Sequence, residues 1–232
     1  MLVDMSYKSA MDTVALPYLL AVGQQYTPCS DDGFPDTLTY QRLIELSDKL
    51  FAYLDIQTRC RLVGTFTHDC KRVDYYYLKD TIGIRQFIDV YLVKNESGYQ
   101  PIMTLSADED NEYYNDFIYP DLYIREYQAN SQLISSLNTQ GDDLNKSRKI
   151  YHWAYFDTDF ERDQYRLIVL ERGFKEEESG KQQGYQQPYF YHFSRRDKPN
   201  RDYMTELTVH LQQEAANLSG TYDGWECEVI SN

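Results

Sequence analysis

Residues 149–174 read KIYHWAYFDTDFERDQYRLIVLERGF, the clearest folding signal in the chain. Lys149–Phe156 is aromatic and alternates in the manner of a β-strand. Thr158 followed by Glu161 has the spacing of a capping box, which predicts that a helix begins there. The positions that recur at helical spacing are Phe160, Leu167, Ile168 and Glu171. Gly173 then stands where a left-handed residue would end the helix, so the stretch predicts a strand followed by a helix.

Two further strands, a second helix and a last strand follow. Phe174–Glu178 and Pro188–Arg195 are strand-like and are separated by a polar turn. Apolar residues at helical spacing begin after Pro199 and end at Gly220, and Tyr222–Ile230 alternates as the last strand. The order is βαββαβ, whose usual solution is a four-stranded antiparallel sheet with both helices on one face, as in ferredoxin-like domains.

The first half of the chain has the same order of elements. The expected elements are strands at 14–22, 62–67, 73–78 and 101–105 and helices at 38–54 and 84–93. Residues 110–137 add two helical pieces, and the polar stretch Asn138–Ser147 is the expected linker. We therefore expect an α+β protein built as two βαββαβ sandwiches in tandem, with domains at 1–140 and 148–232. No repeat is visible between the two halves of the sequence.

The composition excludes several classes of protein. With 42% hydrophobic and 26% charged residues among 232, the chain is that of an ordinary globular protein. No segment has the roughly 20 apolar residues of a membrane-spanning helix. The start of the chain, MLVDMSYKSAMD, does not resemble a secretory signal, so we expect a cytoplasmic protein.

The net charge of −14 disfavours phosphate backbones and anionic lipid as partners. Residues 1–144 carry 22 acidic and 11 basic groups, and residues 145–232 carry 15 and 12, so the acidity lies mainly in the first half. It serves either as a solubilising surface or as an acidic face for a basic partner.

No motif points to a cofactor or a metal. The four cysteines, Cys29, Cys60, Cys70 and Cys227, form no C-x-x-C pair, and we expect reduced thiols. The histidines are scattered, and glycine-rich phosphate loops and nucleophile elbows are absent from the sequence. His152 and His192 lie on strands that the expected fold makes neighbours. They leave a hydrolase open as one interpretation, although structural histidines are commoner in such strands.

The chain contains 23 tyrosines, and aromatic residues alternate along the strands. Tyr151, Trp153 and Tyr155 share one face of the first strand of the second half. Its expected neighbour carries Tyr189, Tyr191 and Phe193. Aromatic residues of this kind serve core packing, a protein interface or the stacking of single-stranded RNA bases, and the three interpretations remain open.

Residues 148–230 resemble a known family. The string HWAYFDTDFERDQYRLIVLERGF, followed by GTYDGWECEV, resembles the bacterial regulator of ribonuclease activity B (RraB). Its most specific piece is Tyr222-Asp223-Gly224-Trp225. The first half, with DGFPDTLTY and VGTFTHDCKRVDYYYLKD, looks like an uncharacterised bacterial domain that occurs fused to this regulator-like domain. There the resemblance implies architecture only.

The resemblance implies a ferredoxin-like, cytoplasmic, non-enzymatic protein that binds endoribonuclease E and restrains it. We expect no catalytic residue, no metal and no cofactor. The candidate partner-binding residues are Trp153, Tyr155, Tyr189, Tyr191, Tyr222, Asp223, Gly224 and Trp225. Trp225 has a second interpretation, in which Asp223-Gly224 forms a bulge and Trp225 packs into the core.

Overall fold

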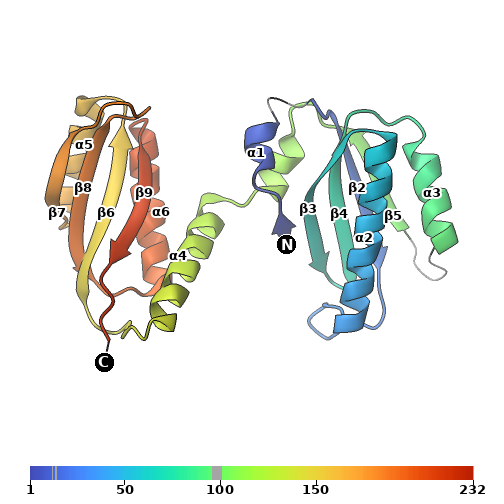
Figure 1. Ribbon diagram of the computed structural model, residues 1–232, viewed down its shortest axis with the longest axis horizontal. Helices are drawn as coiled ribbons and strands as arrows, with labels where there is room; N and C mark the ends of the chain where they lie inside the picture. Colours follow the sequence, from blue (N-terminus) through green and yellow to red (C-terminus); the bar gives the residue numbers. More distant parts are fainter. Residues whose placement is uncertain (12, 14, 96–100, 232) are drawn as a thin grey trace. The chain divides into compact units, whose positions relative to one another are not determined.

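The computed structural model describes residues 1–11, 13, 15–95 and 101–231 and divides the chain into two units (Figure 1). The first unit is Met1–Tyr119 and the second is Pro120–Asn232. The division lies before the linker that the sequence predicted at Asn138–Ser147. The reason is helix α4 (Leu122–Thr139), which packs on a helix of the second unit. An amphipathic helix pattern predicts that a helix forms but not which domain it joins.

The second unit has the βαββαβ order that the sequence predicted. Its elements are β6 (Arg148–Phe156), α5 (Asp159–Glu171), β7 (Lys175–Lys181), β8 (Tyr189–Asp197), α6 (Arg201–Asn217) and β9 (Thr221–Cys227). The strands pair in the order β7-β8-β6-β9, and every pair is antiparallel. The first and third strands of the motif therefore lie side by side at the centre of the sheet, which confirms the ferredoxin-like expectation.

The ends of α5 follow the sequence signals, but its buried face does not. The capping box of Thr158 and Glu161 is formed, and Gly173 adopts a left-handed φ of 81° after the helix. Tyr165 and Val169 are fully buried, whereas Phe160 is 68% exposed and Leu167 is also exposed. The buried face of the helix is therefore formed by Tyr165 and Val169, which pack into the core, and not by Phe160 and Leu167.

The core of the second unit lies between the sheet and α5 and α6, with α4 added beside α6. Trp225 packs with Leu137 of α4 and Met204 of α6. Its indole Nε1 donates to the Asn130 side chain at 2.6 Å, and the Asn130 amide donates to Thr208 at 2.9 Å. These buried bonds between α4, α6 and β9 explain why α4 belongs to this unit.

A buried ion pair fastens the chain before β6 to the chain after β9. Arg148 and Asp142 are both buried and form an ion pair. Asp142 also accepts the backbone N–H of Ile230 at 2.8 Å, and Arg148 donates to the Glu228 carbonyl at 3.0 Å. The hydrogen bond from Arg148 holds the pKa of Asp142 below its ordinary value.

The first unit repeats the same topology. Its elements are β1 (Leu2–Val3), α1 (Tyr7–Ala10), β2 (Tyr18–Gln25), α2 (Thr37–Gln57), β3 (Cys60–His68), β4 (Lys71–Leu78), α3 (Ile84–Asn95), β5 (Pro101–Ala107) and the π-helical turn η1 (Tyr114–Ile118). The strand order is β1-β3-β4-β2-β5. Without β1 this is the order of the second sheet, because β3-β4-β2-β5 corresponds to β7-β8-β6-β9. Helix α2 packs against one face, where Leu50 and Leu54 meet Leu20 and Tyr76.

The first unit also covers part of the other face of its sheet, which the expectation of helices on one face did not include. Tyr7 of α1 stacks on Tyr77 at 5.2 Å and meets Tyr114 of η1 edge-on at 5.0 Å. The Tyr7 hydroxyl donates to Asn111 at 2.7 Å. This cover lies over β3 and β4, where Val63 and Ile118 join the same cluster.

The expectation of four reduced thiols was wrong, because Cys29 and Cys70 form a disulfide across 41 residues of sequence. It ties the loop before α2 to the turn between β3 and β4. The backbone N–H of Cys70 also donates to Gly33 at 3.1 Å. Cys60 and Cys227 are free. Neither a spacing motif nor an export signal revealed the pair, since it is formed by the fold.

Two searches of the described residues found nothing. No helix among them is long and apolar enough to cross a membrane. Nor do the described His, Cys, Asp and Glu residues form a group that could hold a metal ion.

Candidate functional site: the exposed face of the C-terminal sheet

The sheet of the second unit has one face covered by helices and one exposed face. Strand β6 alternates between them, so that Trp153 and Tyr155 lie on the exposed face and Ala154 and Phe156 are fully buried. In the register of β6 and β8, Trp153 lies opposite His192 and Tyr155 opposite Phe190. We define the exposed sheet face by these four residues together with Tyr151.

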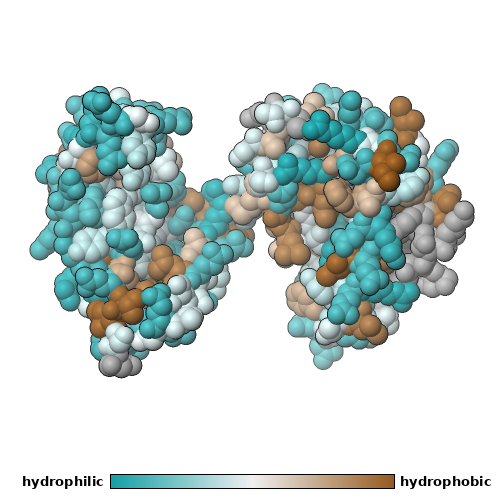
Figure 2. Space-filling model, in the orientation of Figure 1, coloured by the Kyte–Doolittle hydropathy of each residue, from teal (hydrophilic) through white to brown (hydrophobic). Residues whose placement is uncertain are grey.

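Aromatic rings stack along the exposed sheet face. The Trp153 and His192 rings are parallel within 12° and 4.5 Å apart. Tyr151 lies 5.5 Å from His192 and 6.5 Å from Trp153. In Figure 2 the surface over β6 and β8 is largely pale, as Tyr and Trp are on this scale, with hydrophilic residues around it. Strands from both halves of the motif thus build a continuous aromatic surface.

Charged groups lie at the end of the face where β6 begins. The Lys149 ammonium lies 4.8 Å from the centre of the Tyr151 ring and 2.7 Å from the Glu177 carboxylate. Ser194 donates to the same carboxylate at 2.6 Å. The hydrogen bonds from Lys149 and then Ser194 lower the pKa of Glu177, so this end holds a neutralised pair.

A shallow hollow lies at the opposite end of the face. It is lined by Tyr155, Tyr185, Gln186, Gln187, Thr221 and Asp223. Burial and then the neighbouring Asp223 carboxylate raise the pKa of Tyr155, which therefore stays a neutral hydroxyl that can donate a hydrogen bond. Of the residues predicted for partner binding, Trp153, Tyr155 and Asp223 contribute to this face.

The other predicted residues lie in the core or shape the backbone. Tyr191 is fully buried and stacks on Phe193, and Tyr222 is 5% exposed with its hydroxyl 2.8 Å from His152 Nδ1. Tyr189 is partly buried against the same core. Gly224 has a φ of 109° beside the register shift opposite Trp153, which is a β-bulge.

The bulge interpretation of Asp223-Gly224 is therefore confirmed. Trp225, 7% exposed and bonded to Asn130, packs into the core as the second interpretation expected. The tyrosines of β6 lie on the exposed face of the sheet, whereas Tyr189 and Tyr191 of β8 lie on the face that the helices cover. Alternation along a strand does not say which of its two faces is exposed.

The two histidines of the hydrolase interpretation lie on opposite faces of the sheet. His152 is fully buried opposite Phe193, and burial lowers its pKa to about 3. His192 lies on the exposed sheet face against Trp153. Adjacent strands carry them, but the register separates them, so they do not form one catalytic pair.

Two family models match the chain. The model described as a family of unknown function (DUF695) matches residues 1–119, which is 119 of the 232 residues. The chain belongs to the DUF695 family. A second model, regulator of ribonuclease activity B (RraB), matches residues 127–227 of this DUF695 protein. The expected fusion of an RraB-like C-terminal domain to a domain of unknown function is thus confirmed, and the match includes most of α4.

Searches of other proteins add little. No curated protein matches this DUF695 chain. An unknown protein from Galdieria sulphuraria is 8% identical, with a TM-score of 0.24, over 91% of this chain and 99% of its own. A putative glycine cleavage system transcriptional repressor is 9% identical, with a TM-score of 0.25, over 93% and 98%. Likenesses at this level carry no argument about function.

The sequence reasoning missed three members of the site in this DUF695 protein. Phe190, Lys149 and Glu177 were not considered, and His192 was considered only for catalysis. The available signal was the pairing of β6 with β8, because a fixed register places His192 beside Trp153 once either is known to be exposed. The register of β6 with β8 joins strands that are separated in the chain by α5 and β7, so the sequence did not determine it.

Proposed function

We propose that this protein is a non-catalytic cytoplasmic regulator of ribonuclease activity that binds a protein partner through the exposed sheet face. The observation that carries the proposal is the RraB match over residues 127–227, the part of the chain that contains this face. The partner that the resemblance implies is endoribonuclease E. The regulator acts by occupying a surface of the nuclease rather than by chemistry of its own.

The character of the face supports a protein partner. Trp, Tyr and His side chains with a polar rim are enriched at protein interfaces, where they bury large areas at low entropic cost. Trp153 is partly exposed and already held by its stack on His192, with Tyr151 beside both rings, so little ordering is needed on binding. Residues 145–232 carry 15 acidic and 12 basic groups, so this part of the chain offers no basic field for a polyanion.

A second candidate is binding of single-stranded RNA. It is favoured by the stacked His192 and Trp153 rings, with Tyr151 and Lys149 beside them, since bases stack on such platforms. The charge of the chain opposes it, because phosphate neutralisation needs a basic field. The two candidates use the same face and differ in their response to salt.

The test is binding of the full-length protein to purified endoribonuclease E, together with RNA cleavage by that enzyme. We expect saturable binding and slower cleavage. Trp153→Ala should weaken both by at least about tenfold, as expected for an aromatic anchor at an interface. Phe160→Ala is the matched control, because Phe160 is an exposed aromatic residue on α5, in the helix layer of the same unit.

Three outcomes would contradict the proposal. One is the absence of saturable binding at low salt, and another is an equal loss of binding in Phe160→Ala and Trp153→Ala. The third is binding of single-stranded RNA that quenches tryptophan fluorescence and weakens steeply with salt, which would favour the second candidate.

The cytoplasmic assignment has its own test. The Cys29–Cys70 disulfide argues against a reducing compartment, where structural disulfides are rare. Trapping of free thiols at the moment of cell lysis should label Cys29 and Cys70 if the protein resides in the cytoplasm. Full protection of both cysteines in living cells would place it in an oxidising environment and remove this part of the proposal.

A further inference from the structure

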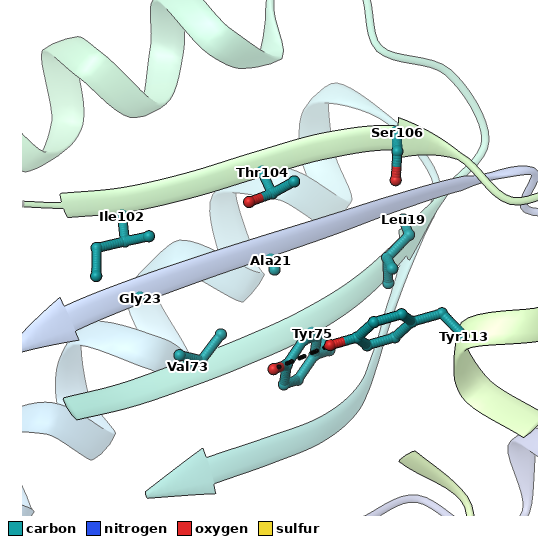
Figure 3. A pocket seen from close by; sticks show the side chains of 9 residues that line it. All are labelled: Leu19, Ala21, Gly23, Val73, Tyr75, Ile102, Thr104, Ser106 and Tyr113. Carbon is teal, nitrogen blue, oxygen red and sulfur yellow. Dashed lines mark hydrogen bonds between the residues drawn. The ribbon is translucent and has the colours of Figure 1, made fainter. Parts of the chain in front are cut away.

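The first unit contains an apolar groove that the RraB match does not reach. It lies on the face of the first sheet away from α2, over β2, β4 and β5 (Figure 3). Its lining residues are Leu19, Ala21, Gly23, Val73, Tyr75, Ile102, Thr104, Ser106 and Tyr113. We call this the β2–β5 groove. The aromatic cover formed by α1 and η1 packs with Leu19 and Tyr75 on one side of the groove, while Ile102 of β5 on the other side stays 49% exposed.

The groove is hollow because its floor is made of small residues. Ala21 and Gly23 of β2 lie on this face of the sheet, between the larger side chains of β4 and β5 (Figure 3). A Cβ at Gly23 would lie 3.2 Å from Val73 and 3.3 Å from Ile102, so these two side chains flank the glycine on either side. Larger residues at the two positions would fill the groove with the protein's own side chains.

One wall of the groove is built by two tyrosines. Tyr113, just before η1, reaches over the sheet toward Tyr75 of β4, and their rings lie 5.5 Å apart with the hydroxyls 3.5 Å apart (Figure 3). Across the groove, Ile102 of β5 is 49% exposed. Exposed apolar residues grouped around a hollow are typical of a binding surface, whereas scattered ones are not.

An acidic rim continues from the groove at the η1 end. A second hollow shares Leu19, Ser106 and Tyr113 with the groove and is lined further by Asp108, Glu112 and Asp116. Residues 101–120 contain five acidic residues and no Lys or Arg. Asp108 accepts the backbone N–H groups of Glu112 and Tyr113, so it holds the turn. Within the described residues, neither Glu112 nor Asp116 takes part in an ion pair.

From this combination we propose that the β2–β5 groove binds a segment of a partner protein that carries large apolar side chains followed by Lys or Arg. The apolar side chains lie over Ala21 and Gly23 against Tyr75. The basic side chains reach Glu112 and Asp116, which form no ion pair among the described residues. This gives the domain of unknown function a recognition role that does not depend on the exposed sheet face of the second unit.

The experiment is selection of a phage-displayed library of random peptides on the full-length protein. We expect enriched peptides to combine aromatic or aliphatic residues with Lys or Arg. The enriched peptide is then synthesised with a fluorophore, and its binding is measured by anisotropy at low and high salt. Salt should weaken the binding because exposed charges are screened.

Two variants locate the binding site, each with a matched control. Ala21→Phe fills the groove and should weaken the peptide at least about tenfold, whereas Ala52→Phe on the exposed side of α2 should not. Glu112→Lys with Asp116→Lys reverses the rim and should weaken it by a similar factor. Asp48→Lys with Asp55→Lys makes the same change in net charge on α2 and should have little effect. Melting curves exclude variants that fail to fold.

The proposal is overturned if no peptide is enriched, or if the enriched peptides lack basic residues. It is also overturned if folded Ala21→Phe and the rim variant bind the peptide as tightly as the wild type. A dimer that Ala21→Phe dissociates, seen by sedimentation, would assign the groove to a second copy of this chain instead. Binding to endoribonuclease E through Trp153 is measured separately and decides nothing about this groove.

Discussion

The two sheets have the same strand order and differ in how their second faces are used. In both, helices cover one face, and the motif's first and third strands lie together at the centre. The first sheet covers part of its other face with α1 and η1 and leaves a hollow over Ala21 and Gly23. The second leaves its other face exposed, and there Trp153 stacks on His192 while Tyr151 lies beside both rings.

The comparison separates what the fold requires from what it leaves free. The helix-covered face must be apolar and well packed, because it is the core of each unit. The opposite face is free to vary, and here one sheet has a groove with an acidic rim while the other has a protruding aromatic surface. Function is therefore expected to reside in these second faces, and each prediction below tests one side of the contrast.

The largest effect is expected at Trp225, on the helix-covered side. Trp225→Ala removes a buried indole and its bond to Asn130, which should cost about 3 to 5 kcal/mol of unfolding free energy. Both tryptophans lie in the second unit, so the fluorescence of the remaining Trp153 reports on that unit alone. Denaturant titration should show its transition shifted to lower concentration. An unchanged midpoint would mean that Trp225 is not a core residue.

The next effect is expected at the disulfide of the first unit. Cys29→Ser with Cys70→Ser opens a loop of 41 residues and should destabilise this unit by about 2 to 4 kcal/mol, because the unfolded chain gains freedom. Circular dichroism follows the whole chain, and tryptophan fluorescence follows the second unit, which should keep its midpoint. A reducing agent added to the wild type should reproduce the variant. Titration of four free thiols per chain in denaturant without a reducing agent would show that the cysteines are not paired.

The sequence predicted the features that depend on neighbouring residues. Local patterns predicted the capping box at Thr158, the helix end at Gly173 and the order of elements βαββαβ along the chain. It did not predict features that depend on distant residues. Cys29 meets Cys70 across 41 residues of sequence at the turn between β3 and β4, and Tyr165 packs against strands on both sides of α5 in the chain. Which face of β8 is exposed depends on the register with β6.

His152 should make the stability of the second unit depend on pH, and His192 on the exposed sheet face provides the comparison. Burial lowers the pKa of His152 to about 3, so the folded second unit resists a proton that the unfolded chain accepts below pH 6.5. Stability is therefore fully present above pH 6.5 and is lost as the pH falls toward 3. At pH 5 the loss should be about 2 kcal/mol, from 1.36 kcal/mol per pH unit.

The measurement is the denaturant midpoint of tryptophan fluorescence at pH 7 and pH 5. His152→Phe removes the titrating group from the aromatic core and should flatten this part of the pH dependence. His192→Gln is the matched control on the exposed sheet face and should retain the dependence. If both variants kept the wild-type slope between pH 7 and pH 5, the acid sensitivity would not come from His152, whereas the lowered pKa values of Asp142 and Glu176 matter only at more acidic pH.

The smallest effect on stability is expected for Trp153→Ala, which makes it the sharpest comparison with Trp225→Ala. Trp153 lies on the exposed sheet face, and its main contact is the stack on His192, so its loss should cost only about 1 kcal/mol. The same change should weaken partner binding by at least about tenfold. One tryptophan would then support the fold and the other would support recognition. A large loss of stability in Trp153→Ala would show instead that the stacked rings are part of the core. That result would contradict the proposal that the exposed sheet face is a binding surface.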